Sequence, residues 1–179
     1  MISEISFRPK PSNNKAKVTF YTCLAIGLGV ALFSMTLELY RGVVGVLAIP
    51  FIVAAVYTYQ RYMGANYSYD VVNGDSGALF VVRQLISKRS STLVCIDLAS
   101  VGSVKRLERE ALCTYKPAKD TAVYRVCPTM SPEFCYCISS STRYSKTEIL
   151  VELTAEAAAL ISSYAAEAKE LKANEDDDY

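Results

Sequence analysis

The stretch that decides the architecture is Gly42–Val71, GVVGVLAIPFIVAAVYTYQRYMGANYSYDV. Its first part is apolar and carries no charge before Arg61, whereas its last part alternates tyrosines with polar residues. A long apolar run suits a helix in lipid, and strict alternation suits a strand with one buried face. The chain is therefore predicted to pass from a membrane segment into a water-soluble domain within these thirty residues.

Two apolar segments make up the predicted membrane part. Val18–Leu37 is twenty residues long without a charge, and Gly42–Tyr59 repeats the pattern around Pro50. A helix of about twenty residues spans about 30 Å, the thickness of the hydrocarbon layer. Because only Glu38–Arg41 joins the segments, we expect an antiparallel transmembrane hairpin over residues 18–60, with a kink at Pro50. We favour this over a signal peptide, since no small-x-small cleavage site follows the first segment, and over a buried hairpin of a soluble protein.

Cations flank this hairpin on the side of the two termini. Four lie before it within residues 8–17, and Arg61 follows it, while the connecting turn holds Arg41 beside Glu38. The positive-inside bias predicts a two-helix protein of the cell membrane with both termini in the cytoplasm, residues 1–17 forming an N-terminal cytoplasmic segment. The hairpin also contains small residues that permit close backbone approach, Ala25, Gly27, Gly29 and Ala31. Packing within the hairpin is our preferred interpretation of them, and a homodimer contact is the alternative.

The composition excludes several classes of function. The chain contains no histidine, which removes the usual general base, the Ser-His and Cys-His nucleophile pairs and most zinc sites. Residues 1–65 carry six Lys and Arg against two Asp and Glu, and the rest carries thirteen against sixteen. A soluble part of net charge −3 argues against general nucleic-acid binding. We therefore predict no enzyme, no cofactor and no catalytic residue.

The polar part, residues 66–172, is predicted to be antiparallel strands followed by one helix. Alternating segments occur at 67–72, 78–86, 92–98, 101–107, 121–127, 134–139 and 146–153, and a further strand within 108–118 is left open. The turn residues Asn73–Gly77 favour a first hairpin, and 121–127 with 134–139 is expected to form another. Thr154 can cap a helix running to Lys172. Its predicted apolar face consists of Ala157, Leu160, Ile161, Tyr164, Ala168 and Leu171. Residues 173–179 are expected to be an acidic disordered tail.

About seven short strands closed by an amphipathic helix is the element order of the pleckstrin-homology (PH) superfold. The sequence combines this order with two preceding predicted membrane helices, a first hairpin with Lys88 and Arg89 at its far turn, and the segment IDLASVGSV (Ile96–Val104). In these features it resembles small uncharacterised membrane proteins of Gram-positive bacteria. Those proteins carry a PH-like cytoplasmic domain. The resemblance implies a membrane helical hairpin followed by an α+β domain, namely a PH-like antiparallel β-sandwich or barrel closed by a C-terminal helix. It gives no information about activity.

The candidate lipid-facing residues form a basic patch. They are Arg83, Lys88, Arg89, Lys105 and Arg106. If the hairpin turns face anionic lipid, each cation contributes roughly 1 kcal/mol. A solvated strand edge, where Lys and Arg discourage sheet pairing, is the alternative interpretation and the one we prefer. Inositol-phosphate binding is disfavoured because the first turn, NGDSG, contains Asp75 and no cation.

Three of the six cysteines form a second candidate cluster. Cys135 and Cys137 are predicted to share one strand face, with Cys127 close by. The C-x-C spacing lacks the usual zinc pattern, so we expect small buried side chains and no metal site.

These observations favour a membrane-anchored protein-interaction or scaffold module that binds a protein partner through an open sheet edge or the groove beside the C-terminal helix. Sensing of a lipid headgroup or a small molecule through the basic hairpin face is the alternative.

Overall fold

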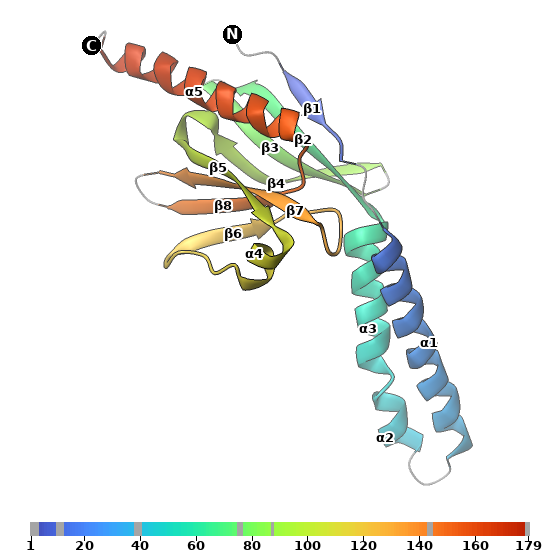
Figure 1. Ribbon diagram of the computed structural model, residues 1–179. Helices are drawn as coiled ribbons and strands as arrows, with labels where there is room; N and C mark the ends of the chain where they lie inside the picture. Colours follow the sequence, from blue (N-terminus) through green and yellow to red (C-terminus); the bar gives the residue numbers. More distant parts are fainter. Residues whose placement is uncertain are drawn as a thin grey trace. The chain divides into compact units, whose positions relative to one another are not determined.

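A computed structural model describes residues 4–9, 13–37, 41–74, 77–86, 88–142 and 145–177. The chain divides into two compact units, a helical unit formed by Pro11–Ala65 and a β unit formed by Met1–Lys10 together with Asn66–Tyr179 (Figure 1). The turn at 38–40 between the apolar segments and the centre of the predicted NGDSG turn lie outside the described residues.

The helical unit contains helix α1 (Asn14–Thr36), the short helix α2 (Arg41–Val46), helix α3 (Ile49–Thr58) and a single π-helical turn, η1 (Tyr59–Met63). Two helical stretches, Asn14–Thr36 and Gly42–Met63, are long and apolar enough to span a membrane. The first begins four residues before the predicted Val18, because Asn14–Lys17 continue the helix with polar residues.

The second stretch breaks just before Pro50, where a kink was predicted. Leu47 N donates to Val44 O and Ala48 N donates to Gly45 O, each at 3.1 Å, so the chain tightens into a turn between α2 and α3. Proline lacks the N–H for an i→i−4 bond, and its ring clashes with the carbonyl four residues earlier. Pro50 therefore lies in the first turn of α3, where backbone N–H groups have no partner within the helix and the proline ring clashes with no carbonyl of that helix.

A glycine sets the contact between α1 and α3. Gly27 is buried, and a Cβ added to it would lie 3.0 Å from Ile52 Cγ1 and 3.3 Å from Phe51 Cβ. Gly29 has no neighbouring atom within 4 Å of the same position. Packing within the hairpin therefore uses Gly27, and Phe20 contacts Tyr59 nearer the other end with ring centroids 5.8 Å apart.

Within the described residues, the strands of the β unit form two four-stranded sheets (Figure 1). The first has the order β1-β2-β3-β4, and the second has the order β5-β7-β8-β6. The strands are β1 (Ile5–Phe7), β2 (Ala65–Gly74), β3 (Gly77–Ile86), β4 (Arg89–Asp97), β5 (Val101–Glu108), β6 (Thr121–Arg125), β7 (Phe134–Ser141) and β8 (Lys146–Val151). A 3-10 turn, η2 (Leu98–Ser100), links the sheets, and α4 (Arg109–Thr114) follows β5. The strands of the described part form no closed barrel, so the structure gives two sheets with a C-terminal helix and not the barrel form of the prediction.

Several predictions were wrong or left open. The segment 108–118, for which a further strand was left open, contains helix α4. The predicted hairpin of 121–127 with 134–139 does not form, because β6 pairs in parallel with β8, and β7 lies between β5 and β8. Residues 5–7, predicted to belong to a separate cytoplasmic segment, form β1 in the first sheet. The last two errors concern pairing between distant segments, which local periodicity does not specify.

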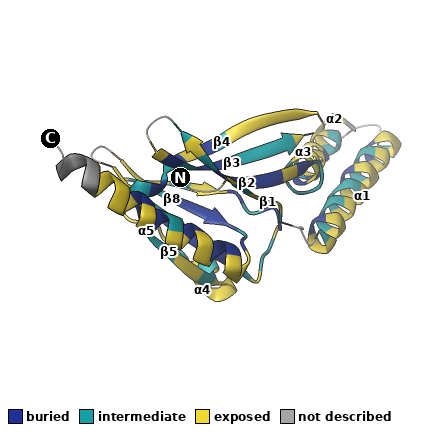
Figure 2. Ribbon diagram, turned by 90° about the horizontal axis from the view of Figure 1, so that it is seen from above, coloured by how far each residue is buried: buried dark blue, intermediate teal, exposed yellow. Residues whose placement is uncertain are grey.

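The C-terminal helix α5 (Ala155–Asp177) covers the end of the core and runs five residues beyond the predicted boundary at 172. Figure 2 shows buried residues along one side of it. That side is Ala157, Ala158, Ile161, Ala165 and Ala168, whereas the predicted members Leu160 and Leu171 are 38% and 50% exposed. Small alanines allow α5 to lie close against η2, β5 and β3. The core beneath is formed by Tyr69, Phe80, Leu98, Ile138 and Ile149, all at 0% exposure.

Candidate functional site

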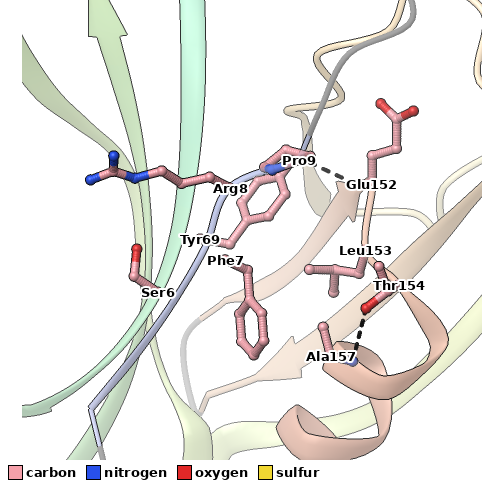
Figure 3. A pocket seen from close by; sticks show the side chains of 9 residues that line it. All are labelled: Ser6, Phe7, Arg8, Pro9, Tyr69, Glu152, Leu153, Thr154 and Ala157. Atoms are coloured by element: carbon pink, nitrogen blue, oxygen red, sulfur yellow. Dashed lines mark hydrogen bonds between the residues drawn. The ribbon is translucent and has the colours of Figure 1, made fainter.

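A cavity of about 370 Å³ lies between β1, the middle of β2 and the start of α5 (Figure 3). A volume of this size falls within the range of small-molecule and side-chain pockets. Its lining residues come from three places in the chain: Ser6, Phe7, Arg8 and Pro9; Tyr69; and Glu152, Leu153, Thr154 and Ala157.

Strand pairing and a helix cap position these residues. Phe7 pairs with Tyr69 in the antiparallel register of β1 and β2, so their side chains lie on the same face of the sheet. On the other side of the cavity, Ala157 N donates to Thr154 Oγ1 at 3.2 Å, which confirms the predicted N-cap. The cap fixes where α5 begins and therefore where Leu153 enters the cavity wall.

Tyr69 is the most constrained residue of the cavity. Its hydroxyl donates to Val126 O at 2.8 Å and accepts a long contact, 3.5 Å, from Glu152 N. Burial raises the pKa of Tyr69 well above its ordinary value near 10, because the phenolate cannot be solvated there. Tyr69 is therefore a neutral donor that joins β2 to the segment after β6.

The charged groups of the cavity lie at its rim. Figure 3 shows Phe7, Leu153 and Ala157 around the interior, with the Arg8 guanidinium and the Glu152 carboxylate directed away from them. Glu152 Oε2 accepts a hydrogen bond from Thr129 N at 3.1 Å. Apolar side chains and polar groups both line the cavity, which suits an apolar side chain flanked by polar backbone or a small amphipathic ligand.

A second cavity, of about 290 Å³, shares Ser6 and Arg8 with the first. There Asp70, 6% exposed, accepts from Ser68 Oγ at 2.5 Å and pairs with Arg83 Nη1 at 3.3 Å. Ser6 Oγ lies 3.1 Å from Ser68 Oγ, which ties β1 to β2 through side chains as well. The buried carboxylate is thus satisfied, as burial of a charge requires.

The structure separates the five predicted basic residues. Arg83 is held by Asp70, and Arg106 pairs with Glu108 at 2.8 Å and stacks 4.2 Å over the Phe134 ring. Lys105 and Arg106 are neighbours on β5 and therefore point to opposite faces of the sheet.

Lys88 and Arg89 are the pair of predicted basic residues that the structure leaves together and exposed, at the turn between β3 and β4. A surface made by all five residues is not present in this arrangement. Asp97, at the end of β4, pairs through its Oδ2 with Lys172 of α5 at 3.2 Å.

The cysteine cluster is partly as predicted. Cys135 and Cys137 are both buried on one face of β7, and Cys127 Sγ lies 3.0 Å from Cys135 Sγ. Cys137 Sγ lies 3.7 Å from the hydroxyl of Tyr115, which donates to the Glu148 carboxylate. Desolvation and the hydrogen bond to Glu148 raise the pKa of Tyr115 above its ordinary value. Across the described ranges, no three His, Cys, Asp or Glu side chains are grouped to hold a metal ion.

Sequence reasoning missed the cavity because it placed residues 1–17 outside the domain. The alternation Ile5-Ser6-Phe7 was the available signal, but three residues are too few to identify a strand. Comparison with known proteins does not supply a family: no protein-family model matches the chain, and no curated protein matches it significantly.

Proposed function

We propose that this chain is a membrane-anchored binding module without catalytic activity. The two apolar helices anchor the β unit at the cytoplasmic face of the cell membrane. The cavity between β1 and α5 accepts an apolar side chain from an extended segment of a partner protein.

The strand pairing supports the membrane arrangement. β1 precedes the helical unit and β2 follows it, yet Ile5 pairs with Val71 and Phe7 pairs with Tyr69. Two strands of one sheet must lie on the same side of a bilayer, and an even number of crossings between them meets that requirement. The excess of cations before α1, including Arg8, Lys15 and Lys17, favours the cytoplasmic side.

The observation that carries the binding proposal is the position of the cavity at an open sheet edge. β1 is an edge strand of its sheet, and its Ser6 and Phe7 line the cavity. An extended peptide that pairs with such an edge can place alternate side chains into an adjacent pocket. Only residues 10–13 separate Pro9 from α1, so we expect the partner among proteins of the same membrane.

Site-specific photocrosslinking in native membranes tests this proposal. A benzophenone side chain at Ser6, which is exposed and lines the cavity, is compared with one at Ser91, which is exposed on β4 at the other end of the same sheet. We expect a discrete protein adduct from position 6 and none from position 91. Equal adducts at both positions, or none at either, would contradict partner binding at the cavity.

The alternative is binding of a lipid headgroup, and the exposed pair Lys88 and Arg89 favours it. Two cations near an anionic surface contribute roughly 2 kcal/mol. The whole chain in nanodiscs with and without phosphatidylserine is followed by hydrogen exchange of the β3–β4 hairpin. Phosphatidylserine-dependent protection that disappears in Lys88→Ser/Arg89→Ser but persists in Lys105→Ser supports this alternative. Protection indifferent to the lipid would exclude it.

A further inference from the structure

Two cysteine sulfurs lie closer together than ordinary packing requires. Cys127 Sγ and Cys135 Sγ are 3.0 Å apart, whereas the S–S bond of a disulfide is about 2.05 Å. Cys127 follows β6 and is half-buried, with its sulfur 3.4 Å from Leu150 O, and Cys135 lies in β7 at 1% exposure. An approach of about 1 Å therefore separates the two thiols from a covalent bond.

We propose that Cys127 and Cys135 are a thiol oxidation site that forms a reversible intramolecular disulfide on reaction with a peroxide. This goes beyond the proposed function and does not depend on it. The half-buried Cys127 is the sulfur that the oxidant reaches first, and the buried Cys135 is the resolving thiol.

The reaction balances with the peroxide as the only oxidant. The Cys127 thiolate attacks one peroxide oxygen, the O–O bond breaks, and the leaving oxygen takes a proton to depart as water or an alcohol. The Cys135 thiolate then attacks the sulfenic sulfur, the S–S bond forms, and the S–O bond breaks with release of water. Two thiols lose two electrons and two protons, and one peroxide is reduced.

The surroundings make this pair selective among the cysteines that the structure describes. Cys95 and Cys113 are exposed on β4 and α4, and no sulfur contact is present at either in the described residues. Cys137 is two residues from Cys135 on the same strand, where the extended backbone holds the two Cα atoms about 6.6 Å apart, near the limit for a disulfide.

The bridge would act on the cavity wall. It closes the loop Pro128–Glu133 between its two cysteines, and the neighbouring residues hold the cavity. Val126 O accepts the Tyr69 hydroxyl, and Thr129 N donates to the Glu152 carboxylate. Oxidation therefore links the loop covalently to β7 close to Val126 and Thr129, whose backbone groups contact the cavity residues Tyr69 and Glu152. We expect slower amide hydrogen exchange of residues 126–133 in the oxidised protein.

The experiment uses the whole chain in nanodiscs, titrated with hydrogen peroxide and then alkylated under denaturing conditions. Glu133 allows cleavage between the two cysteines, so a Cys127–Cys135 bridge joins two peptides that mass spectrometry identifies with a loss of two hydrogens. We expect this species at peroxide concentrations that leave Cys95 and Cys113 fully alkylatable. We expect dithiothreitol to reverse it.

Three variants keep the result decisive. Bridge formation is expected to be unchanged in Cys113→Ser and in Cys137→Ser, because neither substitution removes Cys127 or Cys135. In Cys127→Ser, checked for folding by circular dichroism, Cys135 is expected to stay reduced at the same peroxide dose. Oxidation of Cys127 to sulfinic or sulfonic acid without a bridge, or a bridge that forms only in the unfolded chain, would overturn the proposal.

Discussion

Replacing Tyr69 with phenylalanine tests whether the cavity and the segment after β6 are held by one hydroxyl group. The substitution keeps the buried ring and removes only the donor to Val126 O, at 2.8 Å, and the acceptor of Glu152 N, at 3.5 Å. Val126 is 3% exposed, so its carbonyl would lose its partner where water does not easily replace it. We expect the free energy of unfolding of the β unit to fall by about 1–3 kcal/mol.

Thermal unfolding of the whole chain in detergent, followed by near-ultraviolet circular dichroism, measures this effect. At about 4 °C per kcal/mol for a unit of this size, Tyr69→Phe should lower Tm by about 4–12 °C. The matched control is Tyr124→Phe on β6, whose side chain is 43% exposed and whose loss should change stability by less than about 0.5 kcal/mol. Equal Tm values for the two variants would refute the assignment.

The same variant predicts a difference at alkaline pH. Burial raises the pKa of Tyr69 in the folded protein above that of an unfolded tyrosine. Below pH 10 the tyrosine is protonated in both states, so the full stability that the neutral side chain provides is present there. Above pH 10 the unfolded chain releases this proton and the folded chain retains it, so the free energy of unfolding decreases with pH by up to about 1.4 kcal/mol per unit. Phenylalanine cannot ionise, and Tyr69→Phe should therefore show a shallower alkaline decline. A parallel decline in both proteins would contradict the burial argument.

Two further substitutions test the packing of the other elements. Thr154→Ala removes the N-cap of α5 and should cost about 1 kcal/mol of unfolding free energy, measured by chemical denaturation, whereas the exposed Ser163→Ala should not. Gly27→Val places a Cβ 3.0 Å from Ile52 and should destabilise the α1–α3 contact by about 1–3 kcal/mol, lowering the unfolding temperature in detergent, while Gly29→Val, with open space around it, leaves the temperature unchanged. Equal effects within either pair would show that the contact is not used.

The properties that the sequence determined alone are those that depend on neighbouring residues. The charge-free run Val18–Leu37 specified a helix of membrane-spanning length, and Pro50 specified the break between α2 and α3. The alternation in 67–107 specified β2 to β5, and Thr154 specified the start of α5. Each signal lies within one turn, one strand or one hairpin, so local propensity and periodicity were enough.

Part of the site could be predicted in the same way, because the cysteine spacing on β7 indicated that Cys135 and Cys137 share a face. The five basic residues could not be sorted by sequence. Arg83 pairs with Asp70 thirteen positions away, and Arg106 stacks on the Phe134 ring of another strand. Which cations gain such partners depends on these cross-strand neighbours.

The tertiary structure alone decided the cavity and the sheet order. Phe7 pairs with Tyr69 although the sequence of the helical unit lies between them, and the Tyr69 hydroxyl donates to Val126 O. β6 pairs with β8 in parallel although β7 lies between them in the chain. A three-residue strand carries almost no local preference and is stabilised only when a partner strand buries its apolar face. Closing a long loop costs conformational entropy, and these pairings offset that cost by burying apolar surface between segments that are distant in sequence. Because neither segment alone contains this buried surface, local sequence patterns do not predict the pairing.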